Sequence, residues 1–181
     1  MPNTSGQAYG LTVLTPIEIG SEAILRAYIE GMPEDEKSPF AQLPGTHFVR
    51  LVIIDQLKYQ GEPQDRDTLH SEYLLFESNF DTHDLDGYLT AMCRNLPEIV
   101  NQIWGRCAMF PGTADEAAFL TYMKHNQVPV TFFYTAYPDA TLEDVRSALR
   151  FREQFTRFAV DSQGLEAGAL QERFRAAFGR G

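Results

Sequence analysis

The two most strand-like segments of the chain are His47-Phe-Val-Arg-Leu-Val-Ile-Ile-Asp55 and Glu72-Tyr-Leu-Leu-Phe-Glu-Ser-Asn-Phe-Asp81. Both are rich in β-branched and aromatic residues, and turn formers stand at their ends. Residues 56–70 between them are polar and charged, which is typical of an exposed connection that is long for a hairpin. The pattern predicts two adjacent antiparallel strands at the centre of a sheet. Because residues 47–55 are apolar on both faces, we expect that strand to be covered on both sides.

The flanking sequence supplies two further strands, over residues 11–15 and 128–137. A helical stripe follows the first strand at residues 21–32, and helical patterns also cover residues 84–104 and 113–125. Asp84 or Asp86 can cap the first of these later helices, and Thr113 with Glu116 forms a capping-box pattern before the next. After residue 138 the pattern predicts two more amphipathic helices that end near the C-terminus.

This order of elements predicts an α+β fold of the ferredoxin-like, split βαβ type. Such a fold has a four-stranded antiparallel sheet with helices on one face. We expect one domain over residues 1–181, with a ferredoxin-like core at 11–137 and a C-terminal helical extension at 138–181. The second face of the sheet is then left bare by the chain's own helices, and it needs a cover because it carries apolar residues.

Composition excludes several functional classes. A net charge of −10, with no cluster of basic residues, argues against nucleic-acid binding. No apolar run approaches the ~20 residues of a membrane span. The first residues lack the pattern of a signal peptide, so we expect a cytoplasmic protein. Cys93 and Cys107, the only cysteines, fit small buried residues better than a disulfide or a zinc site.

The character and order of the strands resemble those of the dimeric α+β-barrel superfamily, over roughly residues 11–137. The resemblance rests on residues 11–14, 45–55, 74–81 and 130–134, and no specific enzyme family is matched. It implies a homodimer of two ferredoxin-like sheets with a cavity over the open sheet face. The superfamily includes cofactor-free monooxygenases, chlorite dismutases, dye-decolourising peroxidases and many small uncharacterised proteins, and the fold does not choose among these activities.

Four residues are candidates for a ligand site: His47, Arg50, Glu77 and Asn79. Arg50 is a charge on an apolar stripe, so it needs a partner or an anionic ligand, and Glu77 on the next strand is the expected partner. His47 begins its strand, where a structural role competes with that of a base or ligand. Because His47 and Arg50 are three residues apart on a strand, we expect them to point to opposite faces.

Metal and haem sites have less support in the sequence. The acidic run at residues 81–86, which includes His83, is explained by turns and helix capping, and its spacing departs from a calcium loop, so no metal is expected. His47 or His125 could serve as an axial haem ligand. The peroxidase motif Gly-x-x-Asp-Gly is present only as Asp86-Gly87, with His83 in place of its first glycine, which puts haem in doubt.

Three hypotheses for function follow. The first is a protein, binding or enzymatic, that holds a small apolar or anionic ligand over the open sheet face. If it is an enzyme, it resembles a cofactor-free oxygenase. The second is a dimerising accessory protein without catalysis, in which the polar groups fix the register of the interface. The third is a haem-binding, peroxidase-like protein.

Overall fold

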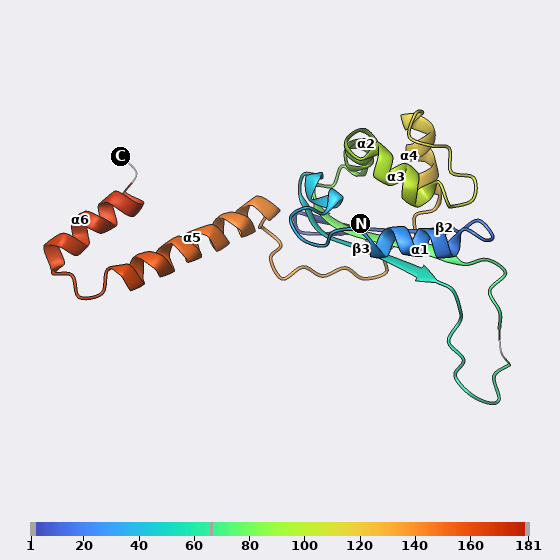
Figure 1. The fold of residues 1–181 in the computed structure, drawn as a ribbon, viewed down its shortest axis with the longest axis horizontal. Helices are drawn as coiled ribbons and strands as arrows, with labels where there is room; N and C mark the ends of the chain where they lie inside the picture. The colour runs from blue at the N-terminus through green and yellow to red at the C-terminus, as the bar shows by residue number, and fades with distance from the viewer. Residues whose placement is uncertain (1–2, 66, 180–181) are drawn as a thin grey trace. The chain divides into compact units, whose positions relative to one another are not determined.

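The computed structural model describes residues 3–65 and 67–179. The chain divides into two compact units, Met1–Thr141 and Leu142–Gly181. The sheet and its covering helices belong to the first unit, and the two C-terminal helices belong to the second (Figure 1).

Within the described residues, the first unit has a four-stranded antiparallel sheet in the order β1-β2-β4-β3. The strands are β1 (Thr4–Ser5), β2 (Ala8–Pro16), β3 (Thr46–Ile54) and β4 (Tyr73–Asp81). The predicted α+β class is confirmed, as is the antiparallel pairing of the two strands predicted at residues 47–55 and 72–81. However, β4 lies between β2 and β3, so β3 is an edge strand and not a central one.

Helices cover one face of this sheet (Figure 1). They are α1 (Glu22–Glu30), the 3-10 helix η1 (Pro39–Gln42), α2 (Leu85–Asn95), α3 (Pro97–Trp104) and α4 (Glu116–His125). Asp84 caps α2 as predicted, since its carboxylate accepts a hydrogen bond of 2.9 Å from the Gly87 amide. The cap of α4 is Asp115 and not the predicted Thr113, because the Asp115 carboxylate accepts from the Ala118 amide.

The core lies between these helices and the sheet. Trp104 of α3 is fully buried and meets Phe76 of β4 edge to face, with ring centroids 5.2 Å apart. Phe80 of β4 stacks on Tyr88 of α2, and the Tyr88 hydroxyl lies 2.7 Å from Ser78 Oγ. Because side chains alternate along a strand, these three β4 residues face the helices and their neighbours face away.

The predicted fourth strand, residues 128–137, is not formed, and the ferredoxin-like topology is therefore not confirmed. The segment starts correctly, because the Val128 amide donates to Thr12 O at 2.9 Å and Leu14 donates to Asn126 O at 3.0 Å. Beyond Pro129 it leaves the ladder. The N-terminal residues occupy that edge instead, since Thr4 and Ser5 pair with β2 in a tight hairpin.

That hairpin also corrects the expected start of the first strand, which begins at Ala8 and not at residue 11. Gly6 makes the turn with a positive φ of 59°. A Cβ atom at this position would lie 2.1 Å from the carbonyl oxygen of Pro138, and the Gln7 amide donates to that same oxygen. The hairpin therefore holds the far end of segment 128–138 against the sheet.

The second unit consists of α5 (Leu142–Asp161) and α6 (Ala167–Phe178), joined by a short turn. The two helices match the predicted C-terminal extension in type. The Gln154 amide donates to Ala177 O, and the Arg173 guanidinium donates to Asp161 O at 2.7 Å. These bonds join α5 to α6 as a helical hairpin.

Candidate functional site

The candidate site is the open face, which we define as the side of β2, β3 and β4 that is turned away from helices α1 to α4. On β4 the buried residues alternate with partly exposed ones, and the exposed series belongs to this face. Strand register places the facing residues of the neighbouring strands beside them. The open face comprises Ala8, Gly10, Thr12 and Leu14 of β2, Tyr73, Leu75, Glu77, Asn79 and Asp81 of β4, and Phe48, Arg50, Val52 and Ile54 of β3.

Apolar side chains on the β3 part of this face are exposed to solvent. Phe48 is 72% exposed, and Val52 is exposed as well. The expectation that this strand is covered on both sides is therefore wrong for the chain by itself. The reason is that α1 to α4 cover only the other face, where Val49 and Leu51 pack against the core.

Arg50 and Glu77 form an ion pair at the centre of the open face. The two residues are opposite each other in the β3–β4 register, and Arg50 Nε donates to Glu77 Oε2 at 2.7 Å. The predicted partner of Arg50 is thus confirmed. Both side chains remain accessible, so the pair contributes only ~0–1 kcal/mol to the stability of the single chain. A ligand or partner protein that covered the open face would remove water from this ion pair.

His47 lies on the same side of the sheet as Arg50, contrary to expectation. A β-bulge between Thr46 and Phe48 inserts His47 as an extra residue, which breaks the two-residue alternation. Its Nε2 atom lies 2.6 Å from Oδ1 of Asp81, an open-face residue of β4. Thr46 instead turns to the helices, where its hydroxyl donates to Tyr88. The bulge thereby gathers His47 with the other three predicted site residues.

Asn79 lies between β2 and β3, opposite Gly10 on one side and Phe48 on the other. Gly10 has no side chain, and the ring of Phe133 occupies the space above it. A Cβ at Gly10 would lie 3.5 Å from both Phe133 and Asn79 Nδ2, which is ordinary contact distance. Sequence reasoning missed Phe133. The available signal was Gly10 itself, since a glycine inside a strand often marks the close approach of another segment.

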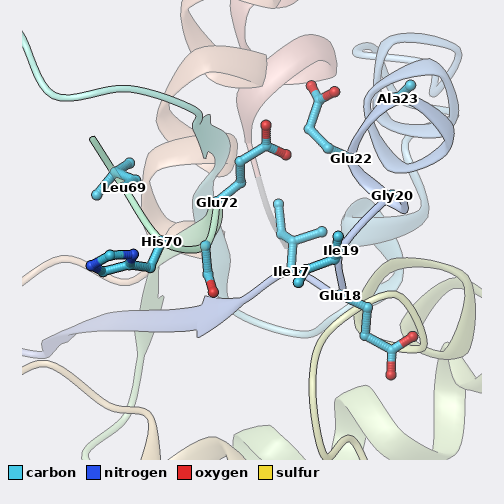
Figure 2. A pocket seen from close by; sticks show the side chains of 10 residues that line it. Ile17, Glu18, Ile19, Gly20, Glu22, Ala23, Leu69, His70 and Glu72 are labelled. Atoms are coloured by element: carbon cyan, nitrogen blue, oxygen red, sulfur yellow. The ribbon is translucent and has the colours of Figure 1, made fainter.

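Apart from the open face, a cleft of about 340 Å³ lies between the start of α1 and the end of the connector before β4 (Figure 2). Figure 2 shows Glu22 on the helix side and Glu72 on the strand side, with His70 on the connector. Glu18 adds a third carboxylate to the lining. The Glu22 carboxylate already accepts a hydrogen bond from Arg26, so it belongs to a surface ion pair of α1.

The two cysteines and the buried tyrosines are structural. Cys93 and Cys107 are free thiols in the core, as predicted. Burial raises the pKa of the Cys107 thiol to about 11, so it stays protonated near neutral pH and is a poor nucleophile. Burial also raises the pKa of Tyr88. His125, at the end of α4, is exposed, and His83 Nε2 lies 2.9 Å from Gly6 O.

Among the described residues, no three His, Cys, Asp or Glu side chains come together as a metal-binding group. None of the described helices combines the length and the apolar character needed to cross a membrane. Comparisons with protein-family models, curated proteins and solved structures found no match to this chain.

Proposed function

We propose that the protein is a non-catalytic assembly module that dimerises through the open face of its sheet. The observation that carries the proposal is the exposure of Phe48 beside the Arg50–Glu77 ion pair, on a face that the chain's own α1 to α4 leave uncovered. The acidic and basic groups of this face are already paired with one another, Arg50 with Glu77 and His47 with Asp81. They are therefore better placed to fix an interface than to attack a substrate.

The charges of the open face favour a second copy of the chain as the occupant. The basic side chains His47 and Arg50 lie on β3, and the acidic side chains Glu77 and Asp81 lie beside them on β4. A two-fold axis would bring the basic column of one copy against the acidic column of the other, twice over. Strands β2, β4 and β3 are neighbours in the same order as strands one, three and two of a ferredoxin-like sheet, which supports the resemblance to face-to-face dimers.

A charge-swap experiment tests this interface. Arg50→Glu puts two negative charges at the pair, and Glu77→Arg puts two positive charges there, so each variant should repel its own copies. When the variants are mixed, each contact across the two-fold axis becomes attractive. We expect native mass spectrometry to show heterodimers well above the share of about one half that random pairing of the two chains gives.

The matched control uses the ion pair on α1, away from the open face, with Arg26→Glu mixed with Glu22→Arg. This mixture should pair at random. A random distribution for the Arg50 and Glu77 variants, or a wild-type protein that stays monomeric at tens of micromolar, would overturn the proposal.

A second candidate function is the binding of a small apolar or anionic ligand between two open faces. It is favoured by the grouping of His47, Arg50 and Asn79 around the exposed ring of Phe48, with Phe133 beside Asn79. A panel of aromatic carboxylates is a suitable probe. A rise in melting temperature that Arg50→Met abolishes would support this function, and no rise with any member of the panel would count against it.

A further inference from the structure

The helical hairpin of the second unit is held together by an aromatic seam, which we define as Phe151, Phe155 and Phe158 of α5 with Phe174 and Phe178 of α6. Rings from the two helices meet edge to face, as in the Phe158–Phe178 pair with centroids 5.2 Å apart. Phe151 also contacts Phe178, at 5.6 Å. The seam is the apolar side of both helices.

The seam is not buried within the unit. Neither α5 nor α6 has a buried residue, and Phe151 and Phe174 are 56% and 47% exposed. In the first unit, by contrast, Phe76 and Trp104 are fully buried. Isolated helices are marginal in water, and a unit of about 40 residues rarely supplies enough core by itself. The hairpin therefore needs a cover.

The exposed apolar area suits a stable protein interface. Seven large apolar side chains of the described part of this unit are exposed, namely Leu149, Phe151, Phe155, Val160, Leu165, Leu170 and Phe174. Four of these, Phe151, Phe155, Leu170 and Phe174, lie on the seam side of the two helices, whereas Leu149 and Val160 lie on the opposite side of α5. At roughly half exposure each, the four present roughly 350 Å², since an aromatic side chain buries about 150–250 Å². A standard interface buries about 800 Å² per partner, of which a little over half is apolar, so the seam supplies most of the apolar part of such an interface.

The charge of the hairpin bears on which partner packs against the aromatic seam. Residues 142–181 contain seven arginines and six acidic residues, which gives a net charge of +1. Because the whole chain has a net charge of −10, residues 1–141 have a net charge of −11. The charges of the hairpin are also paired within it, as in Arg150 with Glu143 and Arg173 with Asp161. A net charge of +1 is too small to attract a charged partner strongly or to oppose association of the hairpin with its own copy.

We propose that the aromatic seam of one hairpin packs against the same seam of a second copy, so that two hairpins form a four-helix bundle. Bundles of this kind bury one apolar face of each helix around a shared core. This interface lies in a different unit from the open face and does not depend on it. The chain therefore has two self-association surfaces.

Helicity as a function of protein concentration tests the bundle. If a second copy orders the hairpin, the circular dichroism signal at 222 nm should fall on dilution from about 50 µM to about 0.1 µM, the range in which weaker interfaces of this size dissociate. Emission of Trp104, the single tryptophan, reports on the first unit and should not change. Helicity that is independent of concentration would overturn the proposal.

Two matched variants locate the surface. Leu170 and Phe174 lie on one side of α6, and by helical spacing Ala176 lies on the other. Leu170→Glu, which leaves all five seam rings in place, should reduce helicity and light-scattering mass at concentrations where the wild type is assembled. Ala176→Glu adds the same charge and should behave as wild type. Equal effects of the two variants would overturn the proposal.

The open-face variant separates the two interfaces. In Arg50→Glu the hairpin should keep the concentration-dependent helicity of the wild type. If this dependence disappears in Arg50→Glu, the hairpin is ordered by the face-to-face dimer and a separate bundle is excluded. If it persists while the charge-swap mixture pairs at random, the bundle stands and the open-face proposal fails.

Discussion

His47 and Asp81 are joined across a β-bulge, with His47 Nε2 2.6 Å from Asp81 Oδ1 and both side chains largely buried. We expect His47→Ala to lower the free energy of unfolding by ~1 kcal/mol, because it leaves the partly buried carboxylate without this partner. Urea unfolding followed by Trp104 emission measures the change. His70→Ala, on the exposed connector, is the control and should stay within about 0.5 kcal/mol of wild type. Equal losses in the two variants would contradict the assignment.

Gly6 and Gly20 form a matched pair for testing how segment 128–138 is held. Both have positive φ values, 59° and 84°, so alanine costs ~1 kcal/mol at either position. Only at Gly6 would the new Cβ meet backbone, at 2.1 Å from Pro138 O, whereas Gly20 has open space. Gly6→Ala should therefore destabilise the protein by at least ~1 kcal/mol more than Gly20→Ala in thermal unfolding. Similar losses of stability in the two variants would show that the backbone at Pro138 moves aside at little cost.

The sheet shows which features the sequence could predict and which it could not. The pairing of β3 with β4, and of Arg50 with Glu77, follows from strand composition and charge, which act locally. The side of the sheet on which His47 lies does not, because a single inserted residue reverses the alternation and leaves little mark in composition. Strand 128–137 was predicted from its β-branched and aromatic residues. It fails because Thr4 and Ser5, in a polar start that looks unstructured, occupy the same edge of β2.

Tyr88 and Ser78 should be energetically coupled. The two hydroxyl oxygens are 2.7 Å apart, and Ser78 is buried on the helix side of β4. Tyr88→Phe should cost ~1–2 kcal/mol, because Ser78 Oγ loses this partner in the core. The double variant Ser78→Ala/Tyr88→Phe should lose less unfolding free energy than the sum of the losses of the two single variants. A double variant whose loss equals the sum of the single losses would contradict the coupling.

Cys107 should make stability depend on pH in the alkaline range. Burial raises the pKa of its thiol to about 11 from an ordinary value of 9.0. Between these values the unfolded chain has released a proton that the folded chain keeps, so stability is full below pH 9 and falls as the pH rises toward 11.

The Cys107→Ala variant tests this contribution. It also removes the smaller effect by which Cys107 raises the pKa of Tyr122, a pKa that burial raises most. Between pH 9 and 11 the free energy of unfolding should fall less steeply in the variant, by up to ~1.4 kcal/mol per pH unit. Chemical denaturation at a series of pH values measures the two slopes. Parallel slopes would show that the thiol titrates alike in both states.

The edge of β2 that faces away from β4 is bonded by three short segments, one from the adjacent N-terminal hairpin and two from distant parts of the sequence. Asn3 bonds to Gly10, residues 126 and 128 bond to Leu14 and Thr12, and the Ala108 amide bonds to the Pro16 carbonyl. Each of these segments bonds to only a few backbone groups of β2. If one segment detaches, only a small part of the backbone of this nine-residue strand is exposed. Short segments that cover an edge in this way keep a long strand from pairing edge to edge with another molecule, and no full-length partner strand is needed.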